Sequence, residues 1–301
     1  MKYKITHTTT YIYESPVRVC HNLVMLTPRE DADVRVHSHR LTISPHPHQL
    51  NARQDFFGNR FHAFSIEESH RQLKVTSTSR LRVLTRKAPN ADTTAAWEQV
   101  AAAITGRYND STRLPEDPNW LEAATYLFDS RLVHRSTTFA DYALQDFTPG
   151  RPILLSAQSL IARIYKEFKY DTSATYVDTL PQEALSIKRG VCQDFAQVAI
   201  SCLRSIGLAA RYVSGYLRTV PPPGHPRLVG SDQSHAWFSL YCGDDVGWID
   251  LDPTNNCACA RDHVPIAWGR DYQDVVPLRG VFLGGGKHTL KVSVDVLPMG
   301  N

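Results

Sequence analysis

The sequence contains no long run of apolar residues. No window approaches the roughly 18 consecutive apolar residues of a membrane-spanning helix. The opening stretch, MKYKITHTTTYIYESP, alternates polar and apolar side chains and lacks the continuous apolar segment of a secretory signal peptide. We therefore expect no membrane partner and a cytoplasmic protein, in which the six cysteines stay reduced.

A strong excess of charge of either sign is also absent. The 33 basic and 30 acidic residues give a formal net charge of +3, which is too small to indicate nucleic acid as a partner. The chain has no internal repeat and no calcium-binding loop of the D-x-D-x-D-G type. With 42% hydrophobic and 21% charged residues, its 301 residues have the composition of a globular protein, and the length favours about two domains. Oligomeric state stays open.

The N-terminal part of the chain is predicted to form β-structure. Apolar and polar residues alternate from Tyr3 onward, and similar strand patterns recur at 34–43, 60–66 and 72–84. Turn-forming sequences such as FGN separate these segments. We expect residues 1–88 to form an antiparallel β domain.

Helix-forming residues become frequent after this region. Residues 95–104 and 119–128 are predicted helices, and residues 156–168 place apolar side chains along one stripe of a third. We assign residues 89–150 to a helical connecting segment. Residues 151–301 are expected to form a mixed core that includes the C-terminal strands, where FLGGGKHTLKVSVDVLP is interpreted as a closing hairpin.

The most tightly patterned stretch is GVCQDFAQVAISCLRSIGLAARYVSGY, residues 190–216. Apolar residues recur in it at helical spacing, and Gly207 suits the left-handed residue that follows a helix. Cys192 would then lie in the first turn, where unpaired N–H groups and the helix dipole favour a thiolate. Most unpaired cysteines are instead small buried residues, and Cys202 on the apolar stripe is expected to be one.

A nucleophilic cysteine needs a base and a group that orients the base. His235 begins one predicted strand, HAWFSLYC, and Asp252 ends the next, GWIDLDP. If Gly243 and Asp244 form a two-residue turn, His235 lies opposite Asp252, whereas a five-residue turn places the two side chains on opposite faces. The residues leave both turns open. Trp237 shares a face with His235 and either lines the site or serves only for packing.

Three motifs in this order, RGVCQDFA, SHAWFSLY and GWIDLDPTNN, resemble the core motifs of the bacterial transglutaminase-like proteins. The likeness extends to YDTSATYVDTLPQEAL before the cysteine and to GRDYQDVVPLRGVF near the C-terminus. The β-rich first part of the chain, with DFFGNR, resembles the N-terminal region of the same family. The resemblance covers most of the chain and is weakest at residues 90–145.

This resemblance implies an α+β fold with a papain-like core and an N-terminal antiparallel β domain. It also implies a triad in which Cys192 is the nucleophile, His235 the general base and acid, and Asp252 the carboxylate that orients the histidine. The backbone N–H of Cys192 would form part of an oxyanion hole, and Tyr170 is a candidate for its second donor. No cofactor is implied.

The implied reaction is attack of the thiol on an amide, followed by transfer of the acyl group from a thioester to water or to an amine. We expect a cysteine peptidase or amidase that acts on a protein or peptide substrate. A transamidating acyltransferase is the alternative, because pocket shape and dryness decide between the two acceptors. A non-catalytic interaction module is a further alternative, although all three triad residues are present.

Two groups of residues offer a metal site as another interpretation. Cys257 and Cys259 form a C-x-C pair that Cys242 and His263 could complete, but the spacing is shorter than in the usual zinc motifs. Four histidines of the N-terminal region form the second group: His37, His39, His46 and His48. We expect neither group to bind a metal, because histidines on strand faces and in loops are more common than ligands.

Overall fold

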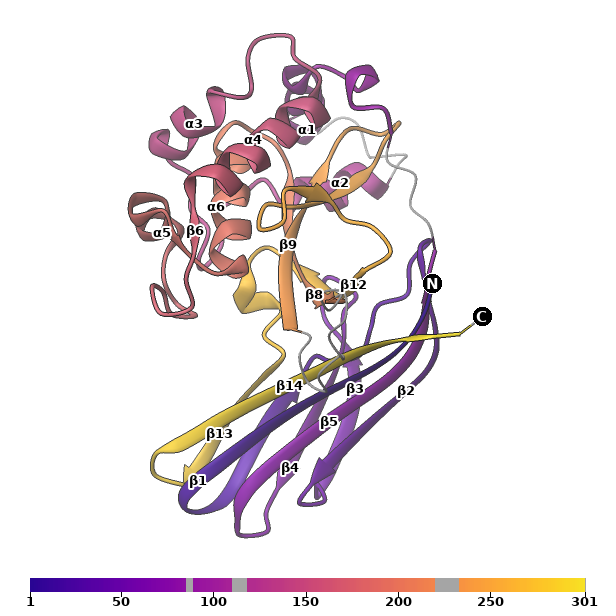
Figure 1. Cartoon of the computed structure of the whole chain (residues 1–301), viewed down its shortest axis with the longest axis vertical. Helices are drawn as coiled ribbons and strands as arrows, with labels where there is room; N and C mark the ends of the chain where they lie inside the picture. Colours follow the sequence, from indigo (N-terminus) through magenta and orange to yellow (C-terminus); the bar gives the residue numbers. More distant parts are fainter. Residues whose placement is uncertain (85–88, 110–117, 220–232, 301) are drawn as a thin grey trace, which may run out of the picture.

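The computed structural model describes residues 1–84, 89–109, 118–219 and 233–300. The chain forms an antiparallel β-sheet and a helix-rich α+β core that lies against one face of the sheet (Figure 1). Among the described helices, none is long and apolar enough to cross a membrane. We expected the N-terminal domain to end at residue 88. Residues 85–88 lie outside the described residues.

The first sheet contains seven strands. Five of them come from the N-terminal part of the chain: β1 (Lys2–Val24), β2 (Val34–Ser44), β3 (Gln49–Gln54), β4 (Arg60–Ile66) and β5 (His70–Val83). The other two are the C-terminal strands β13 (Leu278–Gly284) and β14 (His288–Met299). The strand order is β2-β5-β1-β4-β3, and both C-terminal strands pair with β1.

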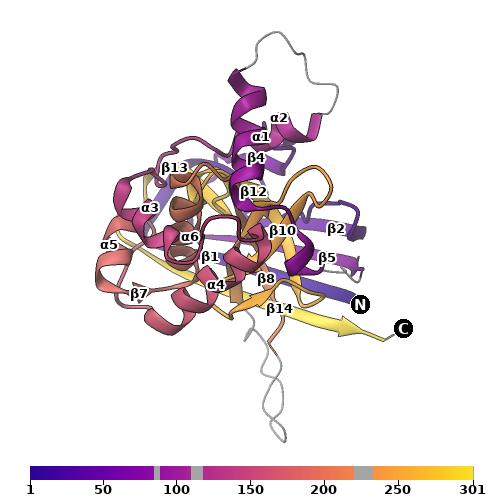
Figure 2. The same cartoon turned by 90° about the horizontal axis from the view of Figure 1, so that it is seen from above.

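Strand β1 organises this sheet because it is long enough to pair with several strands. Tyr3 and Ile5 are buried while Lys2 and Lys4 are exposed, which is the period-two pattern of a strand with one covered face. Strand β14 pairs with the first half of β1, and β13 pairs with its second half. Strand β1 therefore lies in the middle of the strand order, and the view from above shows the core in front of this sheet (Figure 2).

The C-terminal strands correct one of our expectations. We assigned them to the core of residues 151–301, but the β13–β14 hairpin belongs to the N-terminal sheet. The physical reason is that β1 would otherwise present a long row of unpaired backbone groups, which the hairpin satisfies. The chain therefore begins and ends in the same sheet, as the neighbouring N- and C-termini show (Figure 1).

The core combines helices with a second antiparallel sheet. Its helical elements are η1 (Ala91–Thr93), α1 (Trp97–Asn109), α2 (Pro118–Ala124), α3 (Thr137–Leu144), α4 (Ile153–Glu167), α5 (Pro181–Ile187), α6 (Cys192–Ser205) and η2 (Tyr272–Asp274). Its strands are β6 (Lys169–Tyr170), β7 (Arg189–Gly190), β8 (Ala210–Leu217), β9 (Gln233–Tyr241), β10 (Trp248–Asp252), β11 (Cys257–Ala258) and β12 (His263–Gly269). The five-stranded sheet has the order β11-β10-β9-β8-β12. Helices α1, α2 and α4 correspond to the three predicted helices.

Helix α6 is the central element of the core. It packs against β9, α3 and α5, and its residues from Gln193 to Arg204 are all buried. Cys202 is fully buried on it, as expected. At its C-terminal end, the buried Arg204 donates hydrogen bonds to the carbonyl oxygens of Phe128, Ala210 and Arg270. These hydrogen bonds connect the C-terminal end of the helix to three other segments of the core.

The core and the N-terminal sheet share one apolar cluster. Tyr216 of β8 and Val264 and Ile266 of β12 pack against side chains of β1 and β14. Those side chains are Tyr3, Ile5, Val294 and Val296. The N-terminal sheet is therefore part of the wall around the end of the core where β8, β9 and β12 lie side by side.

Candidate active site

Cys192 is the first residue of helix α6, as the sequence predicts. Val191 before it is extended, and its N–H donates to the carboxylate of Asp194 at 2.7 Å. The hydroxyl of Thr175 donates to the same carboxylate oxygen at 2.7 Å. This capping arrangement requires glycine at position 190, because a Cβ on Gly190 would lie 2.4 Å from that oxygen, at a φ of +154°. The RGVCQD motif therefore ends a strand and begins a helix at the thiol.

Two tyrosines lie near the thiol. Tyr170, our candidate second oxyanion donor, is half-exposed, and β6–β7 pairing places it opposite Gly190. Burial and the nearby Cys192 raise the pKa of Tyr170. Tyr212 of β8 is buried and lines the same cavity as Cys192, and burial followed by the nearby Cys192 raises its pKa well above its usual value. Sequence reasoning did not single out Tyr212. The role of Tyr170 stays a prediction.

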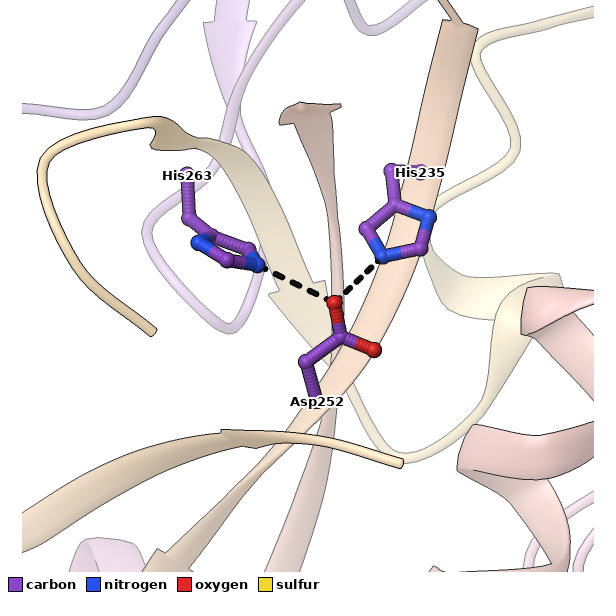
Figure 3. A group of neighbouring side chains, drawn as sticks. All are labelled: His235, Asp252 and His263. Atoms are coloured by element: carbon purple, nitrogen blue, oxygen red, sulfur yellow. Dashed lines mark hydrogen bonds and ion pairs between the residues drawn. The ribbon is translucent and has the colours of Figure 1, made fainter. Parts of the chain in front are cut away.

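His235 lies between Cys192 and Asp252. Its Nε2 atom is 2.7 Å from Oδ2 of Asp252 (Figure 3), and its ring lines the same cavity as Cys192. Burial alone would lower the pKa of His235, but the bonds and charges of Asp252 and Cys192 outweigh it and raise the pKa to about 10. The structure thus brings all three predicted residues together.

The turn between β9 and β10 differs from both turns considered. The N–H of Cys242 donates to the carbonyl of Gly247 at 2.8 Å, which leaves a four-residue turn at 243–246. Gly243, which begins the turn, and Gly247, which follows it, both have positive φ. A four-residue turn shifts the register by two positions relative to a two-residue turn, so His235 and Asp252 keep the same face but lie diagonally. The expectation that the His235 and Asp252 side chains lie on the same face of the sheet is confirmed. The directly opposed position of the two residues, which a two-residue turn would give, is wrong.

Asp252 is fully buried and accepts five hydrogen bonds. Oδ2 accepts from Nε2 of His235 at 2.7 Å, Nε2 of His263 at 3.0 Å and Nδ2 of Asn255 at 2.7 Å. Oδ1 accepts from the N–H groups of Thr254 and Asn255 at 2.9 and 3.2 Å. Burial would raise the pKa of Asp252, but these bonds and the His235 charge hold it well below its usual range. The carboxylate therefore stays ionised.

The sequence did not indicate that His263 belongs to the hydrogen-bond network of the site. We considered it only as a zinc ligand, whereas it donates to Asp252 from the start of β12 (Figure 3). The N–H of Ala260 points at its Nδ1 from 3.4 Å, so Nε2 is the nitrogen that carries the proton toward Asp252. Trp237 packs edge-on against its ring at 5.3 Å. Trp237 is fully buried, so it packs beneath the two histidines and is not exposed in the site.

The same three polar residues also form a group with the chemistry of a metal site. His235, Asp252 and His263 each offer one ligand atom within 4.8 Å of the others. Their atoms are hydrogen-bonded at 2.7 and 3.0 Å, closer than the roughly 3.3 Å that separates ligands about 2.0 Å from a tetrahedral zinc ion. This geometry suits proton donors on a carboxylate rather than metal ligands.

The cysteines considered for zinc are divided between two packing clusters. Cys242 is buried in the large core cluster, and Cys259 packs with Trp237 and Val213 in a separate one. The structure therefore does not bring the Cys242, Cys259 and His263 side chains together as one ligand set.

The thiol and the imidazole open into a cavity of about 640 Å³. Its lining includes Cys192, Gln193 and His235 from the core and residues of β1 and β14 from the N-terminal sheet. A second cavity, of about 750 Å³, lies elsewhere around Phe56 and Phe57 and contains none of the three triad residues. The smaller cavity is the one that can bring a substrate to the thiol.

Two regions of the chain match known protein families. Residues 3–82 match the bacterial transglutaminase-like N-terminal region, and residues 145–253 match the transglutaminase-like superfamily. The chain belongs to the transglutaminase-like superfamily. An uncharacterised protein from Mycobacterium tuberculosis is 38% identical over 305 residues, which cover 99% of this chain and 93% of the relative.

Two further comparisons concern an amidase and a solved structure. A 96-residue stretch is 25% identical to the peptide-N(4)-(N-acetyl-β-glucosaminyl)asparagine amidase of Gallus gallus, and covers 32% of this chain and 12% of that enzyme. The crystal structure of a candidate cysteine protease from Cytophaga hutchinsonii matches with a TM-score of 0.73 at 20% identity, over 100% of this chain and 92% of that one. The predicted α+β fold is confirmed, with a transglutaminase-like core and an N-terminal antiparallel sheet.

Proposed function

We propose that this protein is a thiol enzyme that attacks the amide of a protein or peptide substrate and releases the acyl group to water, as a cysteine peptidase or amidase. The observation that carries the proposal is the position of His235. Its ring is hydrogen-bonded to the fully buried Asp252 at 2.7 Å, and it lines the same cavity as Cys192, which contributes to raising its pKa. A histidine held in this way can stabilise a thiolate and then protonate a leaving amine.

The first half of the reaction follows from these contacts. Sγ of Cys192 attacks the carbonyl carbon, and the carbonyl π electrons move to the oxygen. The N–H of Cys192 at the start of α6 stabilises this oxyanion, with the Tyr170 hydroxyl as the proposed second donor. His235 gives its proton to the amine nitrogen as the C–N bond breaks, which leaves a thioester on Cys192.

In the second half, a water molecule attacks the thioester while His235 accepts its proton. The C–S bond then breaks, the acid leaves, and the thiol and imidazole return to their starting state. Asp252 stays ionised throughout because its five hydrogen bonds stabilise the charged form. The likeness of this chain to an amidase over 96 residues supports water as the acceptor.

The test is to offer a peptide library, which includes glutamine-containing peptides, with and without a primary amine, and to weigh the products. We expect hydrolysis by the wild-type protein, its loss in Cys192→Ala, and its retention in Cys20→Ala, whose thiol lies in the N-terminal sheet. Products that carry the amine would instead identify a transamidase. Turnover that survives Cys192→Ala, or its complete absence in the wild-type protein, would overturn the proposal.

A further inference from the structure

One wall of the active-site cavity is made by the N-terminal sheet. Strand pairing places Tyr11 opposite Leu290 and Thr9 opposite Val292. All four residues line the cavity that contains Cys192. Because side chains alternate along a strand, they share the face of the sheet that is turned toward the core. The sheet therefore contributes directly to the space in front of the thiol.

This wall continues a surface that is buried elsewhere. Val294 and Val296, further along the same face of β14, are buried under β8 and β12. Beyond them, Leu290 and Val292 are each 51% exposed. Apolar side chains that are exposed in the cavity of a nucleophile form a surface on which an apolar group of a ligand is stabilised by leaving water.

Apart from the pair Cys192 and His235, the cavity lining carries little charge. Among the described residues that line it, none is Asp, Glu, Lys or Arg. His7, which also lines it, is bonded to Tyr216 at 2.8 Å and to Thr9 at 3.0 Å, and burial lowers its pKa to about 4, so it is neutral at pH 7. A charged side chain that entered this space would lose water without meeting a counter-charge near the wall.

We propose that Leu290 and Val292 form a subsite for an apolar side chain next to the reacting carbonyl of a peptide. The enzyme then selects aliphatic over acidic or basic residues at that position, and the N-terminal sheet is a specificity element. The inference rests on the proposed function, because it assumes that the bound peptide presents its carbonyl to Cys192. It holds whether water or an amine takes the acyl group.

The test uses peptidyl chloromethyl ketones that differ only in carrying Leu, Glu or Lys beside the ketone. The Cys192 thiolate displaces chloride, a C–S bond forms, and intact-mass spectrometry follows the alkylation rate. We expect the Leu probe to react at least about tenfold faster than the Glu and Lys probes. Val292→Lys and Leu290→Lys should shift the preference toward the Glu probe.

The matched control is Leu283→Lys on β13, an exposed leucine that does not line the cavity. It should keep the wild-type preference. Equal rates for the three wild-type reactions, or an unchanged ratio in both β14 variants, would overturn the inference. A further outcome would also overturn the inference: a wild-type protein that is dimeric in size-exclusion chromatography and a Val292→Lys variant that is monomeric. A second copy of the chain would then cover the Leu290 and Val292 side chains. The alkylation test does not depend on amide hydrolysis. A protein that is alkylated as expected but hydrolyses no amide would therefore count against the proposed function alone.

Discussion

Nε2 of His263 lies 3.0 Å from Oδ2 of Asp252, the same oxygen that accepts the Nε2–H of His235 at 2.7 Å. One carboxylate oxygen therefore receives two imidazole donors from two different strands. Among the described residues, no hydrogen bond joins His263 to Cys192, so we propose that His263 acts on the reaction through Asp252. In that role it is a positioning residue for the base.

The role of His263 can be measured by substitution. His263→Phe removes a hydrogen bond to a charged group, which is typically worth about 1.5–3 kcal/mol. We expect kcat/KM to fall by roughly tenfold to a hundredfold and the acid limb of the pH–rate profile to move upward, because Asp252 becomes easier to protonate. His263→Gln keeps a donor and should recover part of both effects. Equal profiles for wild type and His263→Phe would contradict this role.

Thiol reactivity distinguishes an active site from a vestigial one. Near pH 6, His235 is protonated because its pKa is raised to about 10, and it can stabilise the Cys192 thiolate. Burial raises the pKa of the Cys242 thiol to about 12 and that of Cys257 to about 11. We expect substoichiometric iodoacetamide to label Cys192 first, and His235→Ala to remove most of the preference. Equal labelling of Cys192 and Cys257, read by peptide mass spectrometry, would argue against a poised pair.

Asp252 should make the protein acid-sensitive. Its folded-state pKa lies below its unfolded value, so it contributes stability above pH ~4 that is lost as the pH falls through the folded-state pKa. Asp252→Asn should cost roughly 3 kcal/mol at pH 7, because the amide keeps one acceptor oxygen and turns the other into a donor, so that either the two imidazoles or the two backbone N–H groups lose their acceptor. Urea unfolding should show the difference from wild type shrinking below pH ~4. A constant difference across this range would contradict the assignment.

Gly190 should be irreplaceable at the start of α6. A Cβ at this position would lie 2.4 Å from the Asp194 carboxylate, so Gly190→Ala should cost about 1–3 kcal/mol and slow the labelling of Cys192. Gly106→Ala in α1 is the control, because a Cβ there meets nothing within 4 Å. That change should stabilise the protein by about 0.5–1 kcal/mol. Similar unfolding curves for the two variants would show that the cap tolerates a side chain.

Tyr170 can be tested by separating acylation from alkylation. If its hydroxyl stabilises the oxyanion, Tyr170→Phe should lower kcat by up to about a hundredfold while the iodoacetamide reaction of Cys192, which forms no oxyanion, stays unchanged. Tyr212→Phe provides the comparison from the other side of the thiol. A Tyr170→Phe variant with wild-type kcat would exclude Tyr170 and direct the search to Tyr212.

Much of the site could be predicted because it depends on local patterns. Helical periodicity after Gly190 places Cys192 at the start of α6, and the same apolar stripe buries Cys202. The strands that carry His235 and Asp252 are likewise visible in residue alternation. The DPTNN sequence contained a signal for Asn255 that we did not use, since an aspartate before a turn commonly accepts bonds from the residues that follow it.

Other features were decided only when distant segments met. The β9–β10 turn set the diagonal relation of His235 to Asp252, and the path after β11 brought His263 to the same oxygen. The β13–β14 hairpin joined β1 instead of the core, and so placed Leu290 in the wall of the cavity that contains Cys192. Periodicity reports which face of an element is buried, because it reflects local geometry. It does not report which partner covers that face, because pairing and packing between remote strands depend on the whole fold.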